Sequence, residues 1–128
     1  MKTHNAARLF EALSSEARLQ VFRLLIKHAP DGLVAGEIAK RLKIPSTNLS
    51  FHLKELVHSG LVDMEKEGRF RRCRANVPLM LEVIAYLTSE CCSGNPGQCR
   101  RYRAESGVAP EFFSSCCSGS EPTEGEEV

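Results

Sequence analysis

The cysteines are the residues of this sequence with the most chemistry to offer, six of them in 128 residues. Three lie close together, as Cys91-Cys92 and, six residues further on, Cys99. Thiolates are soft ligands that select soft metals and metalloids. Trivalent arsenic or antimony takes three sulfurs in a pyramid, whereas zinc takes four ligands in a tetrahedron. Three cysteines without a fourth ligand therefore favour arsenite or antimonite, with the glycine- and proline-containing loop 93–98 folding Cys99 back.

The other three cysteines leave alternatives open. Cys116-Cys117 would complete a four-thiolate site for zinc, cadmium or lead, form a second two-thiol site, or pass a metalloid inward. This pair adjoins an acidic low-complexity tail, so we place it second to the first cluster. Cys73 stands alone in a predicted strand, and a plain strand position is its expected role. Neighbouring thiols also oxidise, which keeps redox sensing as a further alternative.

A thiol-dependent reductase is the rival interpretation among enzymes. Such an enzyme needs a cysteine of low pKa in an anion-binding loop at a helix N-terminus. Here the Cys91-Cys92 pair ends a predicted helix that begins near Leu79, and the dipole at a helix C-terminus disfavours a thiolate. We therefore expect neither an enzyme nor a catalytic cofactor.

The segment from residue 36 to residue 62 predicts two short helices joined by a turn. Pro45 ends the first helix, Ser46 or Thr47 is expected to cap the second, and Gly60 to end it. One face of the second helix is apolar, while the opposite face carries small polar side chains that suit a recognition helix in the major groove of DNA. The candidate base readers on that face are Thr47, Asn48, Ser50 and Phe51, and Ser46 is a further DNA-binding candidate.

An arginine-rich hairpin follows this pair of helices. Residues 61–65 alternate, Glu67-Gly68 is a turn signal, and residues 69–74 return as a second strand. The pair of helices alone would equally describe a helical hairpin with a solvated polar face, but the added hairpin predicts a winged helix. Phosphate contacts are expected from Lys54, Arg69, Arg71, Arg72 and Arg74.

Two further helices frame this segment and are expected to make a dimer. The first covers residues 3–13 and precedes a second helix that Ser14 or Ser15 caps. The last helix, residues 79–92, has an apolar stripe through Met80, Ile84 and Leu87. The winged helix is complete without it, so the first and last helices are expected to pair two subunits. The predicted fold is mainly α with a small β-hairpin, a dimeric winged helix-turn-helix.

Charge is unevenly distributed along the chain, although the net charge is only +1. Residues 37–76 hold nine basic and five acidic residues, whereas residues 119–128 hold four glutamates and no base. No apolar run reaches the roughly 18 residues of a membrane span, and the N-terminus lacks a signal-peptide pattern. We expect a cytoplasmic protein without a membrane partner. Its parts would be a DNA-binding and dimerisation domain (1–92), a cysteine-bearing extension (93–118) and a disordered acidic tail (119–128).

This order of elements resembles the ArsR/SmtB-type winged-helix repressors. The resemblance covers about residues 6–88 and is carried by residues 13–19, 46–54, Leu56 and 60–62. Typical arsenic repressors have a Cys-Val-Cys motif in the first helix of the helix-turn-helix, which this chain lacks. Its Cys91-Cys92 and Cys99 instead resemble a subgroup with a Cys-Cys…Cys site at the end of the domain.

The resemblance implies an arsenite-responsive repressor that binds double-stranded operator DNA as a homodimer. Arsenite would tie Cys91 and Cys92 to Cys99 and release the DNA, with antimonite or methylated trivalent arsenicals as alternative inducers. A redox-sensing repressor, or one that senses zinc, cadmium or lead on the same fold, is the alternative function.

Overall fold

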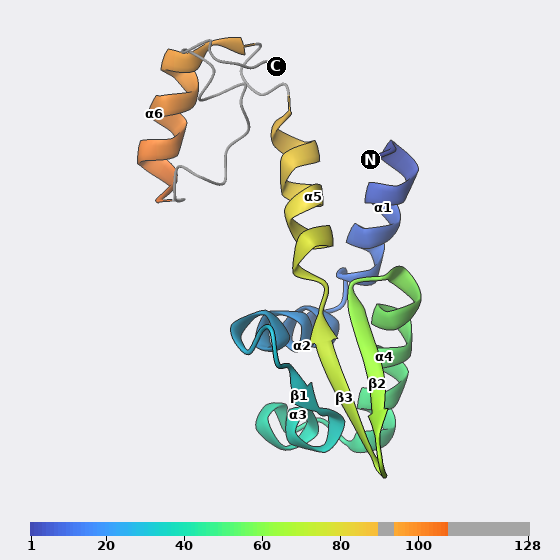
Figure 1. Ribbon diagram of the computed structural model, residues 1–128. Helices are drawn as coiled ribbons and strands as arrows, with labels where there is room; N and C mark the ends of the chain where they lie inside the picture. The colour runs from blue at the N-terminus through green and yellow to red at the C-terminus, as the bar shows by residue number, and fades with distance from the viewer. Residues whose placement is uncertain (90–93, 108–128) are drawn as a thin grey trace. The chain divides into compact units, whose positions relative to one another are not determined.

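The computed structural model describes residues 1–89 and 94–107, in two compact units that divide between Met80 and Leu81. The first unit contains a winged helix-turn-helix, mainly helical with a small antiparallel sheet, as expected (Figure 1). Its elements in chain order are α1 (Thr3–Ala12), α2 (Glu16–Lys27), β1 (Leu33–Val34), α3 (Ala35–Leu42), α4 (Ser46–Ser59), β2 (Val62–Glu67) and β3 (Phe70–Ala75). Helix α5 (Val77–Thr88) runs across the division, and α6 (Pro96–Ser106) lies in the second unit.

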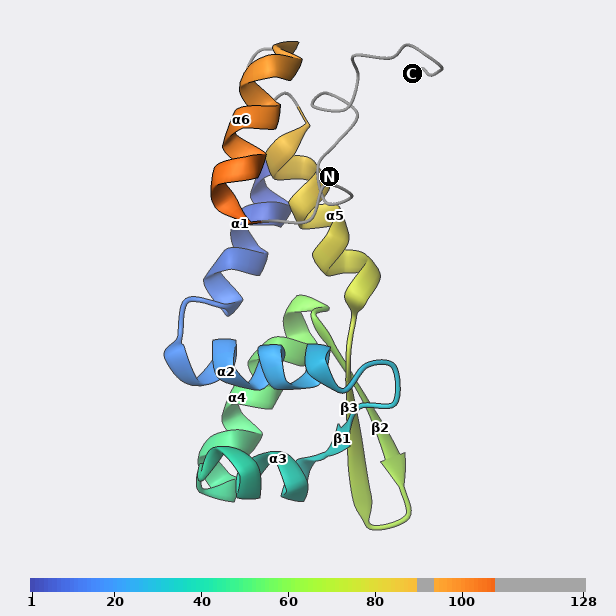
Figure 2. The ribbon, with the colours of Figure 1, turned by 90° about the vertical axis from the view of Figure 1, so that its left-hand side faces the viewer.

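The sheet has three strands in the order β1-β3-β2, one more than the sequence predicts. Strands β2 and β3 form the expected hairpin, with Val62 opposite Ala75 at its root and Glu67 opposite Phe70 at its tip. Strand β1 adds two residues to the other edge of β3, with Leu33 opposite Cys73. The tip of the hairpin extends beyond β1 (Figure 2). Strand β1 therefore pairs with the middle of the hairpin and leaves its tip without a third strand.

The core of the first unit joins α2, α3, α4 and the hairpin. On α4, Leu49, Leu53 and Leu56 recur at helical spacing, and all three are buried. Each such side chain contributes roughly 1.5–3 kcal/mol when it leaves water. They are buried together with residues of the neighbouring elements, namely Val21, Phe22, Leu25, Ile38, Leu61 and Val62. This packing fixes which face of α4 remains outside.

Two helix ends agree with the sequence and two differ. The last helix, expected over residues 79–92, spans Val77–Thr88 and so ends earlier than predicted. The Ser15 hydroxyl accepts a hydrogen bond from the Arg18 amide at 3.3 Å and caps α2, and Gly60, at φ 91°, ends α4. The expected cap of α4 by Ser46 or Thr47 is wrong. Pro45 is the capping residue, and no side chain accepts a bond there. The Pro45 carbonyl already accepts the Leu49 amide, at 2.9 Å, so the helix begins ahead of both hydroxyls.

Helix α6 lies where the sequence suggested a flexible loop. Asn95 caps it, because its Oδ1 accepts the Gln98 amide at 3.2 Å, and Pro96 opens the first turn. The expected loop at residues 93–98 is therefore wrong for Pro96 to Gln98, which are helical. Among the described residues, none of the helices has both the length and the apolar character needed to cross a bilayer.

Candidate nucleic-acid interface and cysteine site

The outer face of α4 carries the residues that the sequence assigned to DNA. Its packing buries the leucine face, so that the opposite side chains project from the domain. Phe51 is the largest of them, with 63% of its surface exposed. The imidazole of His52 is half-buried beside it. The exposed candidates on this helix are Ser46, Thr47, Asn48, Ser50, Phe51 and Lys54.

The arginines of the wing divide between the two faces of the hairpin, because alternate residues of a strand point to opposite sides. Arg71 shares its face with the buried Cys73, and its Nη2 donates to the Ser50 hydroxyl of α4 at 3.4 Å. Lys66 is the cross-strand partner of Arg71 and lies on the same face. This face of the wing therefore turns toward the recognition helix.

Arg72 and Arg74 lie on the other face and are paired with acids. Arg72 Nε is 3.0 Å from both carboxylate oxygens of Glu67, and Arg74 Nη1 is 2.6 Å from Glu65 Oε1. The hydrogen bond that Arg74 donates to the Glu65 carboxylate raises the pKa of Arg74 above its usual range. Arg72 also donates to the carbonyl of Gly32 at 3.4 Å. Both guanidinium groups thus already have partners within the protein.

Other cations near α4 have no such partners. The ion pairs of the wing are made by Arg72 and Arg74. Lys54, Lys66 and Arg69 are exposed and make none of these pairs. Lys66 is a candidate that sequence reasoning missed. Its place opposite Arg71 in the hairpin register was the available signal.

A groove of about 510 Å³ runs between α4 and the wing. Apolar side chains from Val57 and Met64 line it together with polar and basic ones, and the lining contains no carboxylate. Its remaining lining residues are Ser50, Lys54, His58 and Arg71. The groove therefore combines an apolar surface with positive charge, next to the exposed face of the recognition helix.

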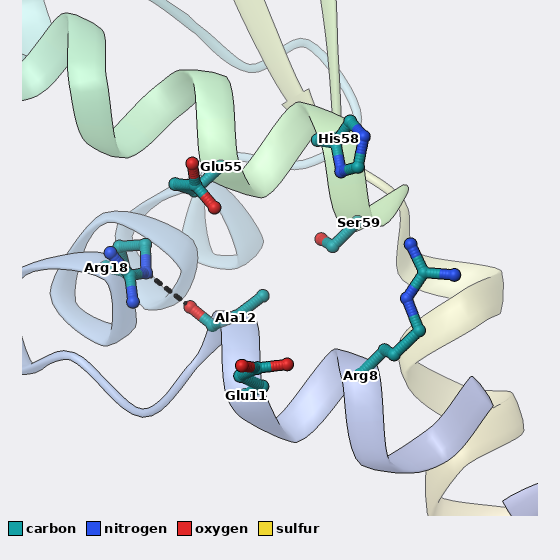
Figure 3. Close-up of a pocket in the computed structure, with 7 residues that line it drawn as sticks. All are labelled: Arg8, Glu11, Ala12, Arg18, Glu55, His58 and Ser59. Atoms are coloured by element: carbon teal, nitrogen blue, oxygen red, sulfur yellow. Dashed lines mark hydrogen bonds between the residues drawn. The ribbon is translucent and has the colours of Figure 1, made fainter. Parts of the chain in front are cut away.

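A second hollow, of about 290 Å³, lies where α1 and the start of α2 meet the end of α4 (Figure 3). Arg18 Nε donates to the Ala12 carbonyl at 2.7 Å and ties α2 to the end of α1. The lining mixes both signs of charge, with Arg8 and Glu11 from α1 and Glu55 and His58 from α4. This hollow marks the contact through which α1 packs against the recognition helix.

The predicted cysteine site is described only at Cys99. This residue lies in the first turn of α6, is 1% exposed, and has its sulfur in a disulfide bond. Cys91, Cys92, Cys116 and Cys117 lie outside the described residues. In the described ranges, no three His, Cys, Asp or Glu side chains are grouped to hold a metal ion.

Cys73 is a free thiol in strand β3. It is fully buried, and this burial raises the pKa of its thiol. A buried, protonated thiol is a poor nucleophile and a poor ligand. The plain strand position expected from the sequence agrees with this environment.

Known proteins match the chain over the winged helix. A family profile described as a helix-turn-helix domain matches residues 13–65. The transcriptional activator HlyU of Vibrio cholerae is 32% identical over 79 residues, which are 59% of this chain and 70% of that protein. The uncharacterised HTH-type transcriptional regulator YceK of Bacillus subtilis is 36% identical over 63 residues, or 49% of this chain. The chain thus spans only 62% of the length of YceK.

Solved structures that resemble this chain are also transcriptional regulators or DNA-binding domains. Reduced HlyU from V. cholerae superposes with a TM-score of 0.55 at 31% identity, covering 66% of this chain and 90% of that one. An ArsR-like transcriptional regulator from Rhodococcus sp. RHA1 gives 0.59 at 28% identity, covering 83% and 93%. A homodimeric winged helix-turn-helix DNA-binding domain from Mycobacterium bovis gives 0.54 at 26% identity, covering 70% and 82%.

The fold and its exposed recognition helix thus define a winged-helix transcriptional regulator, a class of DNA-binding protein. The chain belongs to the ArsR family of these regulators. The named relatives are transcriptional regulators rather than enzymes.

Proposed function

We propose that this chain represses transcription by binding operator DNA as a homodimer and releases it when trivalent arsenic binds Cys91, Cys92 and Cys99. The observation that carries the DNA-binding part is the exposed polar face of α4 beside a cationic wing. Thr47, Asn48 and Ser50 would read base edges in the major groove, and Phe51 would contact a thymine methyl group.

Unpartnered apolar side chains support the dimer. Phe10 on α1 is 45% exposed, and Leu81 and Leu87 on α5 are 42% and 58% exposed. Large apolar side chains in these two helices would leave water if two copies paired through them. The M. bovis relative is homodimeric by description. A two-fold dimer would present two recognition helices to a roughly palindromic site.

The cysteine chemistry supports arsenite as the inducer. Three thiols would displace the three hydroxyls of arsenous acid, forming three arsenic–sulfur bonds and releasing three waters. Cys99, one of the three proposed ligands, lies in the first turn of α6. The disulfide at Cys99 would first have to be reduced to two thiols by a cellular dithiol, which would itself be oxidised to a disulfide.

The contact of α1 with α4 would let a change at the dimer interface, caused by inducer binding, alter the binding of DNA. α1 would lie in the dimer interface, and it packs directly on the recognition helix. A change in the angle between the two subunits would therefore shift α4 relative to the major groove of the DNA. A coupling of about 1–3 kcal/mol, typical of allostery, would weaken DNA binding by roughly 5- to 150-fold.

A redox-sensing repressor is the second candidate, favoured by the disulfide at Cys99. Peroxide would oxidise two thiols to a disulfide and would itself be reduced to two waters. HlyU has been solved in a form described as reduced. In this alternative, closing the disulfide would take the place of arsenic binding.

One titration tests both candidates. The reduced full chain would be bound to a duplex selected from a random pool, and release would be followed against arsenite, antimonite, zinc, cadmium, lead and peroxide. We expect release by arsenite and antimonite at concentrations where zinc has no effect. Release by peroxide without release by arsenite would replace the first candidate with the second.

A further inference from the structure

We propose that the hollow between α1, α2 and α4 binds a small zwitterion, namely a free α-amino acid with a small or polar side chain. The hollow lies within the first unit of the structure, and each of the three helices contributes ionisable side chains to its lining (Figure 3). Arg8 and Glu11 come from α1, Arg18 from α2, and Glu55 and His58 from α4. This inference adds a ligand that differs from both DNA and arsenic.

The formal charges that line this hollow cancel. Arg8 and Arg18 are cationic, Glu11 and Glu55 are anionic, and His58 is counted as neutral. A ligand with charge of a single sign would meet like charge in the same hollow. A zwitterion can instead place each of its two ends beside an opposite charge. The lining therefore favours a molecule that carries both an ammonium group and a carboxylate.

These charged side chains do not neutralise one another. Arg8 and Glu11 are three residues apart on α1, a spacing that permits an ion pair on a helix surface. In the part of the chain that the structure describes, neither of them takes part in an ion pair. The same holds for Glu55 on α4. Charges of both signs thus border one hollow and are available to a ligand.

Arg18 is oriented by a backbone contact and would bind the carboxylate of the ligand. Its Nε donates to the Ala12 carbonyl at 2.7 Å, which fixes the side chain and leaves the two Nη groups (Figure 3). A planar guanidinium group donates paired hydrogen bonds to a carboxylate. The ammonium group of the ligand would then be held by Glu11 and Glu55.

The size and polarity of the hollow limit the ligand. Its volume of about 290 Å³ is just below the roughly 300–1,000 Å³ that is typical of small-molecule sites. Among its lining residues only Ala12 is apolar. A large aliphatic or aromatic group would therefore find little apolar surface, whereas an amino acid with a small or polar side chain matches both the volume and the charges.

A ligand in this hollow would connect the two helices on which the proposed function depends. Glu11 belongs to α1, which would lie in the dimer interface, and Glu55 belongs to the recognition helix. An ammonium group held by both carboxylates would fix α1 against α4, which are already in contact. We therefore expect the amino acid to change the affinity for DNA, and this consequence rests on the proposed function.

Ligand binding can be measured on the full chain without DNA. Common L-amino acids would be tested singly at millimolar concentration, because a ligand that binds only the folded state raises the midpoint of thermal unfolding. We expect a rise of about 3–8 °C with at least one small or polar amino acid. The N-acetyl derivative and the amide of that amino acid, which each lack one charge, should give no rise.

Two results of this screen would contradict the proposal. If no amino acid raised the midpoint, the hollow would not be a zwitterion site. If the N-acetyl derivative acted like its parent, the site would be one for simple anions.

Two variants test the location of the site by calorimetric titration with the best amino acid. Glu55→Gln removes charge at the ammonium end and Arg18→Gln at the carboxylate end, and each should weaken binding by roughly tenfold or more. Arg23→Gln is the matched control, an exposed arginine of α2 that does not line the hollow, and it should bind like the wild type. Because Glu55 is exposed, its variant remains informative if Arg18→Gln fails to fold. Wild-type affinity in Glu55→Gln would assign the ligand to another place.

A DNA titration separates this inference from the proposed function. The affinity for the selected duplex should change by roughly fivefold or more when the amino acid is added, and Glu55→Gln should lose this change. A chain that binds the amino acid but no duplex would refute the proposed function and leave the site intact. A chain that binds the duplex but no amino acid would refute the site alone. Amino-acid binding that leaves the DNA affinity unchanged would refute the coupling between α1 and α4.

Discussion

Arg72 and Glu67 form a forked contact across the outer face of the wing, with Nε 3.0 Å from each carboxylate oxygen. Glu67 Oε2 also lies 3.9 Å from Arg74 Nη2. One carboxylate thus neutralises part of two arginines in the segment that the sequence marks as most basic. The number of arginines in a wing therefore overstates the charge that it can offer to DNA.

Removing this carboxylate should strengthen DNA binding. Glu67→Gln deletes a negative charge and frees Arg72 for solvent or phosphate. We expect roughly threefold tighter binding to a mixed-sequence duplex at low salt, with a steeper salt slope. Glu11→Gln, which removes a carboxylate from α1, is the control and should change neither. Equal affinities for Glu67→Gln and the wild type would contradict the role of this pair.

The two serines proposed as helix caps should differ in their effect on stability. Ser15→Ala removes the bond to the Arg18 amide and should lower the free energy of unfolding by about 1 kcal/mol. Ser46→Ala removes no cap and should stay within about 0.5 kcal/mol of the wild type. Urea unfolding followed by circular dichroism measures both. A larger loss at Ser46 than at Ser15 would argue against the described start of α4.

Gly32 should be intolerant of any side chain. Its φ is +75°, and a Cβ there would collide with the carbonyl oxygen of Cys73. We expect Gly32→Ala to cost about 3 kcal/mol of unfolding free energy, measured by urea denaturation. Gly36→Ala is the matched control, since that position in α3 has open space, and it should stabilise the protein by up to about 1 kcal/mol. Similar losses in both variants would be inconsistent with this geometry.

The Cys73 thiol should make stability fall at alkaline pH. Burial raises its pKa in the folded protein, so the unfolded chain loses the proton first. The stabilisation is complete below the pKa of an unfolded thiol, about 8.5, and is lost as the pH rises through the higher folded value. Urea midpoints measured at rising pH should decline less in Cys73→Ala than in the wild type. An identical decline would assign the effect to other groups.

Cys99→Ser tests the proposed inducer site. The variant should bind the selected duplex with wild-type affinity, because Cys99 lies in α6 rather than in the winged helix. It should lose release by arsenite, because one of three sulfur ligands is gone. Cys73→Ala is the control and should keep the response. Release of Cys99→Ser at the wild-type arsenite concentration would show that this thiol is not a ligand.

Much of the winged helix follows from local signals in the sequence. The spacing of Leu49, Leu53 and Leu56 determines which face of α4 is buried, and Gly60 ends the helix in the left-handed region. The alternation of the hairpin places Cys73 inside. These features depend on residues a few positions apart, which periodicity and capping rules describe well.

Other features depend on partners that are distant in sequence. Strand β1 has only two residues, too few to show an alternating pattern in the sequence. It forms because the free edge of β3 provides backbone partners for it. The outer-face ion pairs follow from the hairpin register, which sets Glu65 opposite Arg72. The glycine and proline at the start of α6 indicated a loop instead of a helix. Asn95-Pro96 is nevertheless a typical start of a helix. The roles of Cys91, Cys92, Cys116 and Cys117 stay predictions, since these four residues lie outside the described part of the chain.

Strand β1 has a consequence for how such regulators diversify. Strand β1 pairs with Cys73 and Arg72, next to the helix-turn-helix, and does not reach the tip of the hairpin, where Glu67 pairs with Phe70. Insertions, deletions or grafted loops at that tip would lengthen or shorten the reach of the protein without disturbing its interior. The wing tip is thus an exchangeable module, and swapping it between paralogues offers a way to retune target choice.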